Sequence, residues 1–85
     1  MLITLDVYVL VGCANCSYAQ QLANTTAAAY PQVRVRVRDL ACTSDVPDMV
    51  FAAPTYVLND RVISLGNPDE AALHLLLEQA LAEGQ

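Results

Sequence analysis

The stretch from Val11 to Leu22, VGCANCSYAQQL, places two cysteines three residues apart, where an apolar run gives way to helix-forming residues. Cys13 and Cys16 could form a redox centre or half of a metal site, or Cys13 could be the lipid-modified cysteine of a signal peptide. Asp6 interrupts the preceding apolar run, and no Lys or Arg follows the first residue, so we do not expect a signal peptide. The redox and metal interpretations both stay open on these residues alone.

The composition predicts one folded domain over residues 1–85. Hydrophobic residues make up 55% of the 85 residues and charged residues 15%, which is typical of a chain with a packed core. The net charge is -5, and phosphate contacts need clustered Lys or Arg, so we expect no nucleic-acid partner. The apolar runs are too short to span a bilayer, so we expect no membrane partner either.

The chain has three cysteines, whereas a secreted disulfide scaffold of this size usually has an even number. One local pair with a distant Cys42 fits a reducing compartment, and we expect a cytoplasmic location. Cys42 follows a predicted strand that runs parallel to the first, so it leaves the sheet at the same edge as Cys13. It is therefore a candidate auxiliary thiol or third metal ligand, but no fourth ligand is apparent and we predict no bound metal.

The first half of the chain predicts a strand, a helix and a second strand. Residues 2–11 (LITLDVYVLV) are apolar on both alternating faces, which is typical of a central strand buried on both sides. Gly12 ends this strand, and we expect a helix that opens at Cys13 and stops before the Tyr30-Pro31 pair. Residues 33–39 (VRVRVRD) predict an edge strand whose valines face the core and whose arginines face solvent.

The second half predicts a short helix, a hairpin and a final helix. Residues 43–51 carry the short helix, and residues 55–58 and 61–65 form the hairpin, whose turn residues Asn59 and Asp60 tolerate positive φ. The order β-α-β-(short α)-β-β-α predicts an α/β fold with a four-stranded mixed sheet and helices on its faces. A strand–helix–strand start implies that the first two strands are parallel.

The final helix carries a clear start signal. Asn67 is expected to be its N-cap, Pro68 its first residue, and Glu70 the acidic residue three positions past the cap. His74 lies between glutamates at the edge of the apolar stripe, so we expect it on the solvated surface. The stripe itself consists of Leu73, Leu76, Leu77, Ala80 and Leu81.

The predicted position of the two cysteines suits dithiol chemistry. A helix that opens at Cys13 places its thiol near the free N–H groups of the first turn, where the helix dipole stabilises a thiolate. Cys16, one turn further in, is expected to be more shielded. Exchange with a disulfide needs this asymmetry, because Cys13 can attack a substrate while Cys16 resolves the mixed disulfide.

The Cys-Ala-Asn-Cys pair at a strand-to-helix junction, with Ala53-Pro54-Thr55 ahead of a hairpin, resembles the thioredoxin/glutaredoxin superfamily over nearly the whole chain. The resemblance implies a thioredoxin-like fold and a cis peptide bond before Pro54. It also implies that Gly12, Ala53, Pro54 and Thr55 form the substrate-binding surface beside the dithiol. Gly12 stands where thioredoxins usually have tryptophan.

The resemblance further implies a thiol-disulfide oxidoreductase with Cys13 as nucleophile and Cys16 as resolving thiol. Such an enzyme reduces protein or small-molecule disulfides, takes electrons from a reductase or glutathione, needs no cofactor, and serves electron transport and cell redox homeostasis. Two other functions stay open. One is a non-catalytic thioredoxin-fold module that binds a partner through the Pro54 groove, and the other is a metal-binding protein that uses Cys13 and Cys16 with Cys42.

Overall fold

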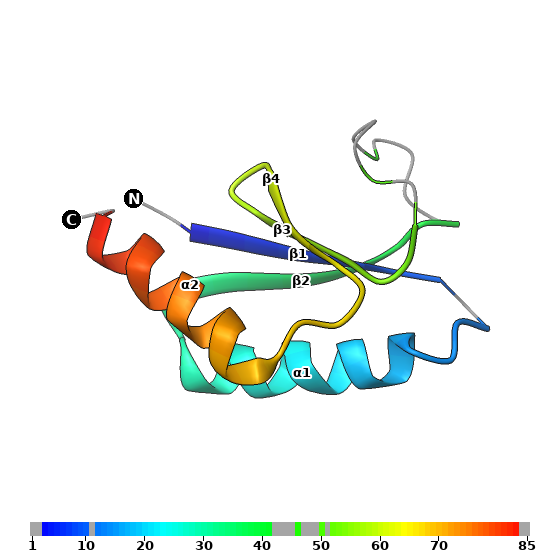
Figure 1. Cartoon of the computed structure of the whole chain (residues 1–85), viewed down its shortest axis with the longest axis horizontal. Helices are drawn as coiled ribbons and strands as arrows, with labels where there is room; N and C mark the ends of the chain where they lie inside the picture. The colour runs from blue at the N-terminus through cyan, green and yellow to red at the C-terminus, as the bar shows by residue number, and fades with distance from the viewer. Residues whose placement is uncertain (1–2, 11, 42–45, 47–49, 51, 84–85) are drawn as a thin grey trace.

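Strand β1 (Ile3–Val9) is an inner strand of a four-stranded mixed sheet whose order is β2-β1-β3-β4 (Figure 1). It pairs in parallel with β2 (Val33–Asp39) and antiparallel with β3 (Thr55–Leu58), which forms a hairpin with β4 (Arg61–Leu65). The structure is a computed structural model that describes residues 3–10, 12–41, 46, 50 and 52–83. The predicted inner strand, edge strand, parallel pair and hairpin are confirmed, and both hairpin turn residues have positive φ.

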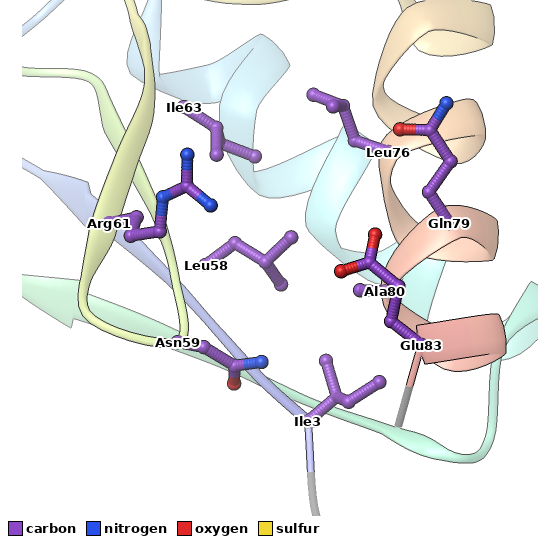
Figure 2. A pocket seen from close by; sticks show the side chains of 9 residues that line it. All are labelled: Ile3, Leu58, Asn59, Arg61, Ile63, Leu76, Gln79, Ala80 and Glu83. Carbon is purple, nitrogen blue, oxygen red and sulfur yellow. The ribbon is translucent and has the colours of Figure 1, made fainter. Parts of the chain in front are cut away.

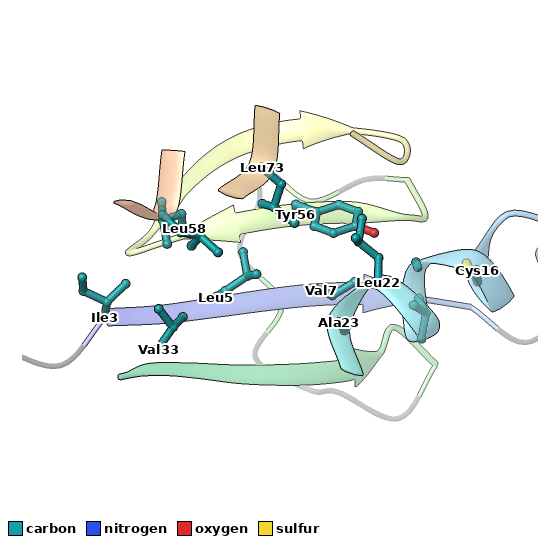
Figure 3. Packing of buried hydrophobic residues seen from close by; sticks show 13 residues of the cluster. Ile3, Leu5, Val7, Cys16, Leu22, Ala23, Val33, Tyr56, Leu58 and Leu73 are labelled. Carbon is teal, nitrogen blue, oxygen red and sulfur yellow. The ribbon is translucent and has the colours of Figure 1, made fainter. Parts of the chain in front are cut away.

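Helices α1 (Cys16–Ala29) and α2 (Glu70–Glu83) pack on the same face of the sheet (Figures 1 and 3). One cluster of buried side chains joins them to the strands. Its members are Ile3, Leu5, Val7 and Val9 of β1, Cys16, Ala19, Leu22 and Ala23 of α1, Val33 of β2, Tyr56 and Leu58 of β3, and Leu73 and Leu77 of α2. Neither helix in this part of the chain is long and apolar enough to cross a membrane.

The opposite face of the sheet carries a second, smaller cluster. Tyr8 and Val57 are buried there with Val50, and the partly buried Leu40, Val46 and Val62 pack against them. Because alternate residues of β1 enter the two clusters, the strand is buried on both faces, as its sequence predicted. The short helix predicted for residues 43–51 lies outside the described residues except for Val46 and Val50, so it stays a prediction.

The arginines of β2 do not form the solvent-facing row that their alternation predicted. Arg36 donates from Nε and Nη2 to the two carboxylate oxygens of Asp6, at 2.6 and 2.9 Å, and Asp6 is only 8% exposed. The guanidinium carbon of Arg38 lies 6.0 Å from the centre of the Tyr8 ring. The prediction was wrong here because the second face of β1 presents a carboxylate and an aromatic ring, which attract cations. The valines of β2 were predicted to face the core, but Val37 is 42% exposed.

Helix α1 begins at Cys16 and not, as predicted, at Cys13. Residues 12–15 form a turn instead, in which the Cys16 N–H donates to the Cys13 carbonyl oxygen at 3.2 Å. The helix ends at Ala29, before Tyr30, as the following proline requires.

Helix α2 begins at Glu70, and Asp69 rather than Asn67 caps it. The Oδ2 atom of Asp69 accepts a hydrogen bond from the Ala72 N–H at 3.3 Å, and its backbone oxygen accepts one from the Leu73 N–H at 2.9 Å. The predicted cap was wrong because the Asn67 side chain is used elsewhere in the fold.

His74 is half-buried and not on the solvated surface. Its ring meets the Tyr30 ring edge-on, with 5.1 Å between ring centres, and its Nε2 is buried without a hydrogen-bond partner among the described residues. The Tyr30 hydroxyl donates to the Glu78 carboxylate at 2.8 Å. The surface prediction failed because Tyr30, directly after α1, lies over this part of α2.

The pair formed by Asp6 and Arg36 gives a first prediction. We expect Arg36→Met to lower the free energy of unfolding by about 1–3 kcal/mol, because it leaves a nearly buried carboxylate without its partner. Urea denaturation measures this loss. Arg34→Met is the matched control, since Arg34 is exposed on the same strand and should cost less than about 0.5 kcal/mol. Equal losses in both variants would contradict a role of the ion pair.

Candidate functional site

The two halves of the candidate site meet where β1 ends and β3 begins. Tyr8 of β1 pairs with Thr55 of β3, and the strands are antiparallel, so the residues after β1 and before β3 reach the same edge. The Cys13 Sγ lies 3.8 Å from the carbonyl oxygen of Ala53. The Ala53–Pro54 peptide bond is cis, as the resemblance implied. Four of the predicted residues are therefore grouped at this edge.

The dithiol is carried by a tight turn that Gly12 makes possible. Gly12 has a φ of +88°, a conformation that residues with a side chain rarely adopt, so a substitution here would strain the backbone. The Cys13 N–H then donates to the Leu10 carbonyl oxygen at 3.1 Å.

The two thiols differ in accessibility. Cys13 is partly exposed, Cys16 is 5% exposed, and both are free. Burial raises the pKa of Cys16, and the neighbouring Cys13 thiol raises it further, while a backbone hydrogen bond with Leu10 acts in the opposite direction. The prediction that Cys16 is the more shielded thiol is confirmed. The site thus has an accessible sulfur with a buried, protonated one behind it.

Two short hydrogen bonds hold the loop that faces the dithiol. The Thr55 hydroxyl, which is fully buried, donates to the Ala52 carbonyl oxygen at 2.6 Å. The Gly66 N–H donates to the Pro54 carbonyl oxygen at 2.7 Å. These bonds fix the backbone on both sides of Ala53, whose own carbonyl points to the Cys13 sulfur.

Sequence reasoning missed two residues of the site, Asn67 and Tyr56. The Asn67 Nδ2 donates to the carbonyl oxygen of Asn15, between the two cysteines, at 2.9 Å. The Tyr56 hydroxyl donates to the Asn67 Oδ1 at 3.0 Å. The predicted hairpin could have indicated that Asn67 lies near the dithiol. Leu65 pairs with Thr55 at the dithiol edge of the sheet, and Asn67 follows two residues later.

The metal interpretation depends on Cys42, which lies outside the described residues. In the part of the chain that the structure describes, no three His, Cys, Asp or Glu side chains are grouped so that they could hold a metal ion. The Leu40 N–H donates to the Val9 carbonyl oxygen at 2.9 Å, so β2 ends at the same edge as β1. The auxiliary role of Cys42 stays a prediction.

A hollow of about 430 Å³ lies at the other end of the sheet (Figure 2). It opens between the β3–β4 turn and the C-terminal part of α2. Its lining residues are Ile3, Leu58, Asn59, Arg61, Ile63, Leu76, Gln79, Ala80 and Glu83. None of the predicted site residues lines it, so this cavity is not part of the dithiol site.

The difference in accessibility predicts the order in which the cysteines react. With a limiting amount of iodoacetamide near neutral pH, Cys13 should be alkylated before Cys16, because Cys16 is buried and its pKa is raised. Peptide mapping by mass spectrometry measures the order. The preference should shrink in urea, where both thiols are accessible. Preferential labelling of Cys16 in the native protein would contradict the assignment.

Tyr56 gives a prediction for alkaline pH. Burial raises its pKa from 10.0 to about 12, so between these values the unfolded chain loses a proton that the folded chain keeps. The free energy of unfolding should therefore fall as the pH rises through this window. Urea denaturation at several alkaline pH values should show a steeper fall for the wild type than for Tyr56→Phe. Equal slopes would show that Tyr56 ionises normally.

The fold of this chain is similar to the folds of solved thioredoxin structures. Thioredoxin from Trypanosoma brucei brucei aligns with a TM-score of 0.77 at 17% identity, over 95% of this chain and 76% of that chain. Mitochondrial thioredoxin 3 from Saccharomyces cerevisiae, in its oxidized form, aligns with a TM-score of 0.74 at 24% identity, over 92% and 78%. Fasciola hepatica thioredoxin aligns with a TM-score of 0.74 at 16% identity, over 91% and 79%.

The similarity is one of structure rather than of sequence. No protein-family model matches the sequence, and no curated protein matches it significantly. The structural alignments nevertheless cover nearly the whole chain, which consists mainly of the four-stranded mixed sheet and its two helices. The chain therefore has a thioredoxin-like fold.

Proposed function

We propose that this protein is a thiol-disulfide oxidoreductase that reduces disulfides of proteins or small molecules with its Cys13–Cys16 dithiol. One observation carries the proposal. The accessible Cys13 sulfur lies 3.8 Å from the Ala53 carbonyl oxygen, with the buried Cys16 behind it, in a thioredoxin-like fold. This arrangement supports a substrate disulfide that approaches from the exposed side and a second thiol that completes the reaction.

The proposed reaction passes two electrons from the dithiol to the substrate. The Cys13 thiolate attacks one substrate sulfur, so a mixed disulfide forms and the substrate disulfide breaks, releasing one thiolate that takes a proton from water. Cys16 then loses its proton to water and attacks the Cys13 sulfur. A Cys13–Cys16 disulfide forms, and the second substrate sulfur leaves as a thiolate.

The different environments of the thiols support this division of roles. Cys13 can meet a bulky substrate because it is partly exposed, whereas Cys16 cannot. The raised pKa of Cys16 keeps its thiol protonated near neutral pH, so Cys16 does not attack a substrate disulfide in place of Cys13. Once Cys13 carries the substrate, the fixed position of Cys16 favours intramolecular attack over hydrolysis or exchange in solution.

The backbone around Ala53 supports binding of an extended substrate segment. An extended peptide or glutathione could pair with backbone groups at Ala53 in the manner of an added strand. The hydrogen bonds of Thr55 to Ala52 and of Gly66 to Pro54 hold this backbone in place before substrate arrives. Gly12 is exposed and has no side chain, so it leaves the approach to Cys13 open.

The cycle needs an external donor of two electrons. We propose that a dithiol reductase of the thioredoxin reductase kind, or glutathione, returns the disulfide to the dithiol. We place the activity in the cytoplasm, where thiol pools keep such a pair reduced and where it would serve redox homeostasis and electron transport. The sulfurs carry the electrons themselves, so the proposal includes no bound cofactor.

Turnover of a protein disulfide tests the proposal. Insulin reduction should proceed with NADPH and thioredoxin reductase, or with glutathione and its reductase, because one of these donors should reduce the dithiol. Cys13→Ser should abolish turnover, and Cys16→Ser should accumulate a mixed disulfide with the substrate, since the resolving thiol is missing. Ser17→Ala, at an exposed neighbouring position, is the control and should keep full activity.

Other outcomes of the same experiment favour the other functions. Absence of turnover with both donors would contradict the oxidoreductase proposal. Tight binding of a partner without turnover would instead indicate a binding module. Stoichiometric zinc that stays bound after desalting, and that is lost in Cys13→Ser, would indicate the metal-binding function.

A further inference from the structure

The side chain of Asn67 joins a buried strand to the turn that carries the dithiol. Its Oδ1 accepts a hydrogen bond from the hydroxyl of Tyr56, a fully buried residue of β3, at 3.0 Å. Its Nδ2 donates to the carbonyl oxygen of Asn15 at 2.9 Å. Asn15 lies between the two cysteines, so Asn67 links the core of the sheet to the centre of the dithiol turn. The Tyr56 ring is labelled in Figure 3, on the helix-covered face of the sheet.

The chemistry of the partners fixes the orientation of the Asn67 amide. A backbone carbonyl can only accept a hydrogen bond, so the amide NH₂ group must face Asn15. The Oδ1 atom then faces the Tyr56 hydroxyl, which is free to donate. The same amide could not satisfy both partners if it were rotated by half a turn, because two acceptors would then face each other.

The peptide group between Asn15 and Cys16 is consequently held at both ends. Its carbonyl oxygen accepts from Asn67 at 2.9 Å and from the Ala19 N–H at 3.2 Å. Its N–H donates to the Cys13 carbonyl oxygen at 3.2 Å. Hydrogen bonds in such a chain polarise one another, so each of them strengthens the next.

Asn67 is distinctive among the contacts of this turn. Helix α1 has no side-chain hydrogen bond at its N-cap, Asn15. Within the described ranges, Asn67 is the only residue whose side chain donates a hydrogen bond to the backbone of residues 13–16. The Asn67 amide, from the loop before α2, therefore adds a side-chain anchor to the two backbone hydrogen bonds that hold the Asn15–Cys16 peptide.

We infer that Asn67 is a positioning residue for the resolving step, an inference that rests on the proposed function. By holding the Asn15–Cys16 peptide, it keeps the Cys16 sulfur directed at the Cys13 sulfur of the mixed disulfide. In that step the Cys13–substrate bond breaks, the Cys13–Cys16 bond forms, and the substrate sulfur leaves as a thiolate. The described hydrogen bonds of the Asn67 side chain go to Tyr56 and Asn15 and not to a sulfur, so its loss should leave the first attack by Cys13 unaffected.

Rapid mixing of the reduced protein with Ellman's reagent separates the two steps. The attack by Cys13 releases one thionitrobenzoate, and the attack by Cys16 on the resulting mixed disulfide releases a second, both visible as absorbance. A Cys42→Ser background in every protein leaves only these two thiols to react. Asn67→Ala should slow the second release by about tenfold, the value of one hydrogen bond, and change the first by less than about twofold.

Two further variants keep the test decisive. Asn67→Asp keeps an acceptor for Tyr56 and nearly the same volume but replaces the donor to Asn15, so it should also slow the second release. Asn24→Ala removes an exposed asparagine on α1 and should change neither step. General unfolding would expose both thiols and change the first release as well, so a slower second release with an unchanged first release does not come from loss of the fold.

The outcomes distinguish this inference from the proposed function. A second release in Asn67→Ala and Asn67→Asp that stays within about twofold of the wild-type rate would overturn the role of Asn67. An intramolecular second release does not depend on reagent concentration. If the second release of the wild type rises with reagent concentration, Cys16 does not resolve the mixed disulfide and the proposed function itself fails.

Discussion

The antiparallel pairing of β1 with β3 is the constraint on which the site depends. Tyr8 faces Thr55 across this pair, Cys13 follows five residues after Tyr8, and Pro54 immediately precedes Thr55. The dithiol, which follows β1, and the facing loop, which precedes β3, therefore lie at the same edge of the sheet. A slip of one residue would send every side chain of β1 to the wrong face, so burial on both faces fixes the register and the site together.

Asp6 disfavours a slipped register of β1 more strongly than apolar residues alone would. A slip would place its carboxylate among the apolar helix-facing side chains, on the other face of the sheet from Arg36. In the observed register it meets Arg36 on the neighbouring strand, with two hydrogen bonds of 2.6 and 2.9 Å. The ion pair also anchors the edge strand β2. The valines of this strand become more exposed toward its end, since Val33 is buried and Val37 is exposed.

The sequence patterns predicted the elements well because those patterns report burial. The double apolar alternation of residues 2–11 and the stripe of α2 follow from which face enters the core, although Leu76 of the stripe is 38% exposed. The Asn59-Asp60 turn follows instead from residues that tolerate positive φ. The cis bond before Pro54 and the facing loop came from resemblance, not from any local pattern. The arginine face and the surface position of His74 were wrong, because both depend on partners from distant segments, Asp6 with Tyr8 and Tyr30 respectively.

The start of α2 shows why such details lie beyond local rules. Asn67 and Asp69 are both good N-cap residues, and the local rule favoured Asn67 because Pro68 and Glu70 follow it at suitable spacing. Of the two, only Asn67 has a side-chain amide, which accepts from Tyr56 while it donates to the Asn15 carbonyl, whereas an ionised carboxylate can only accept. Asp69 satisfies the free N–H of Ala72 in its place, so the helix keeps a cap worth about 1 kcal/mol while the amide serves the dithiol turn. Two capping residues two positions apart thus allow one of them to be used by the site, and the buried Tyr56 of β3 determines which one it is.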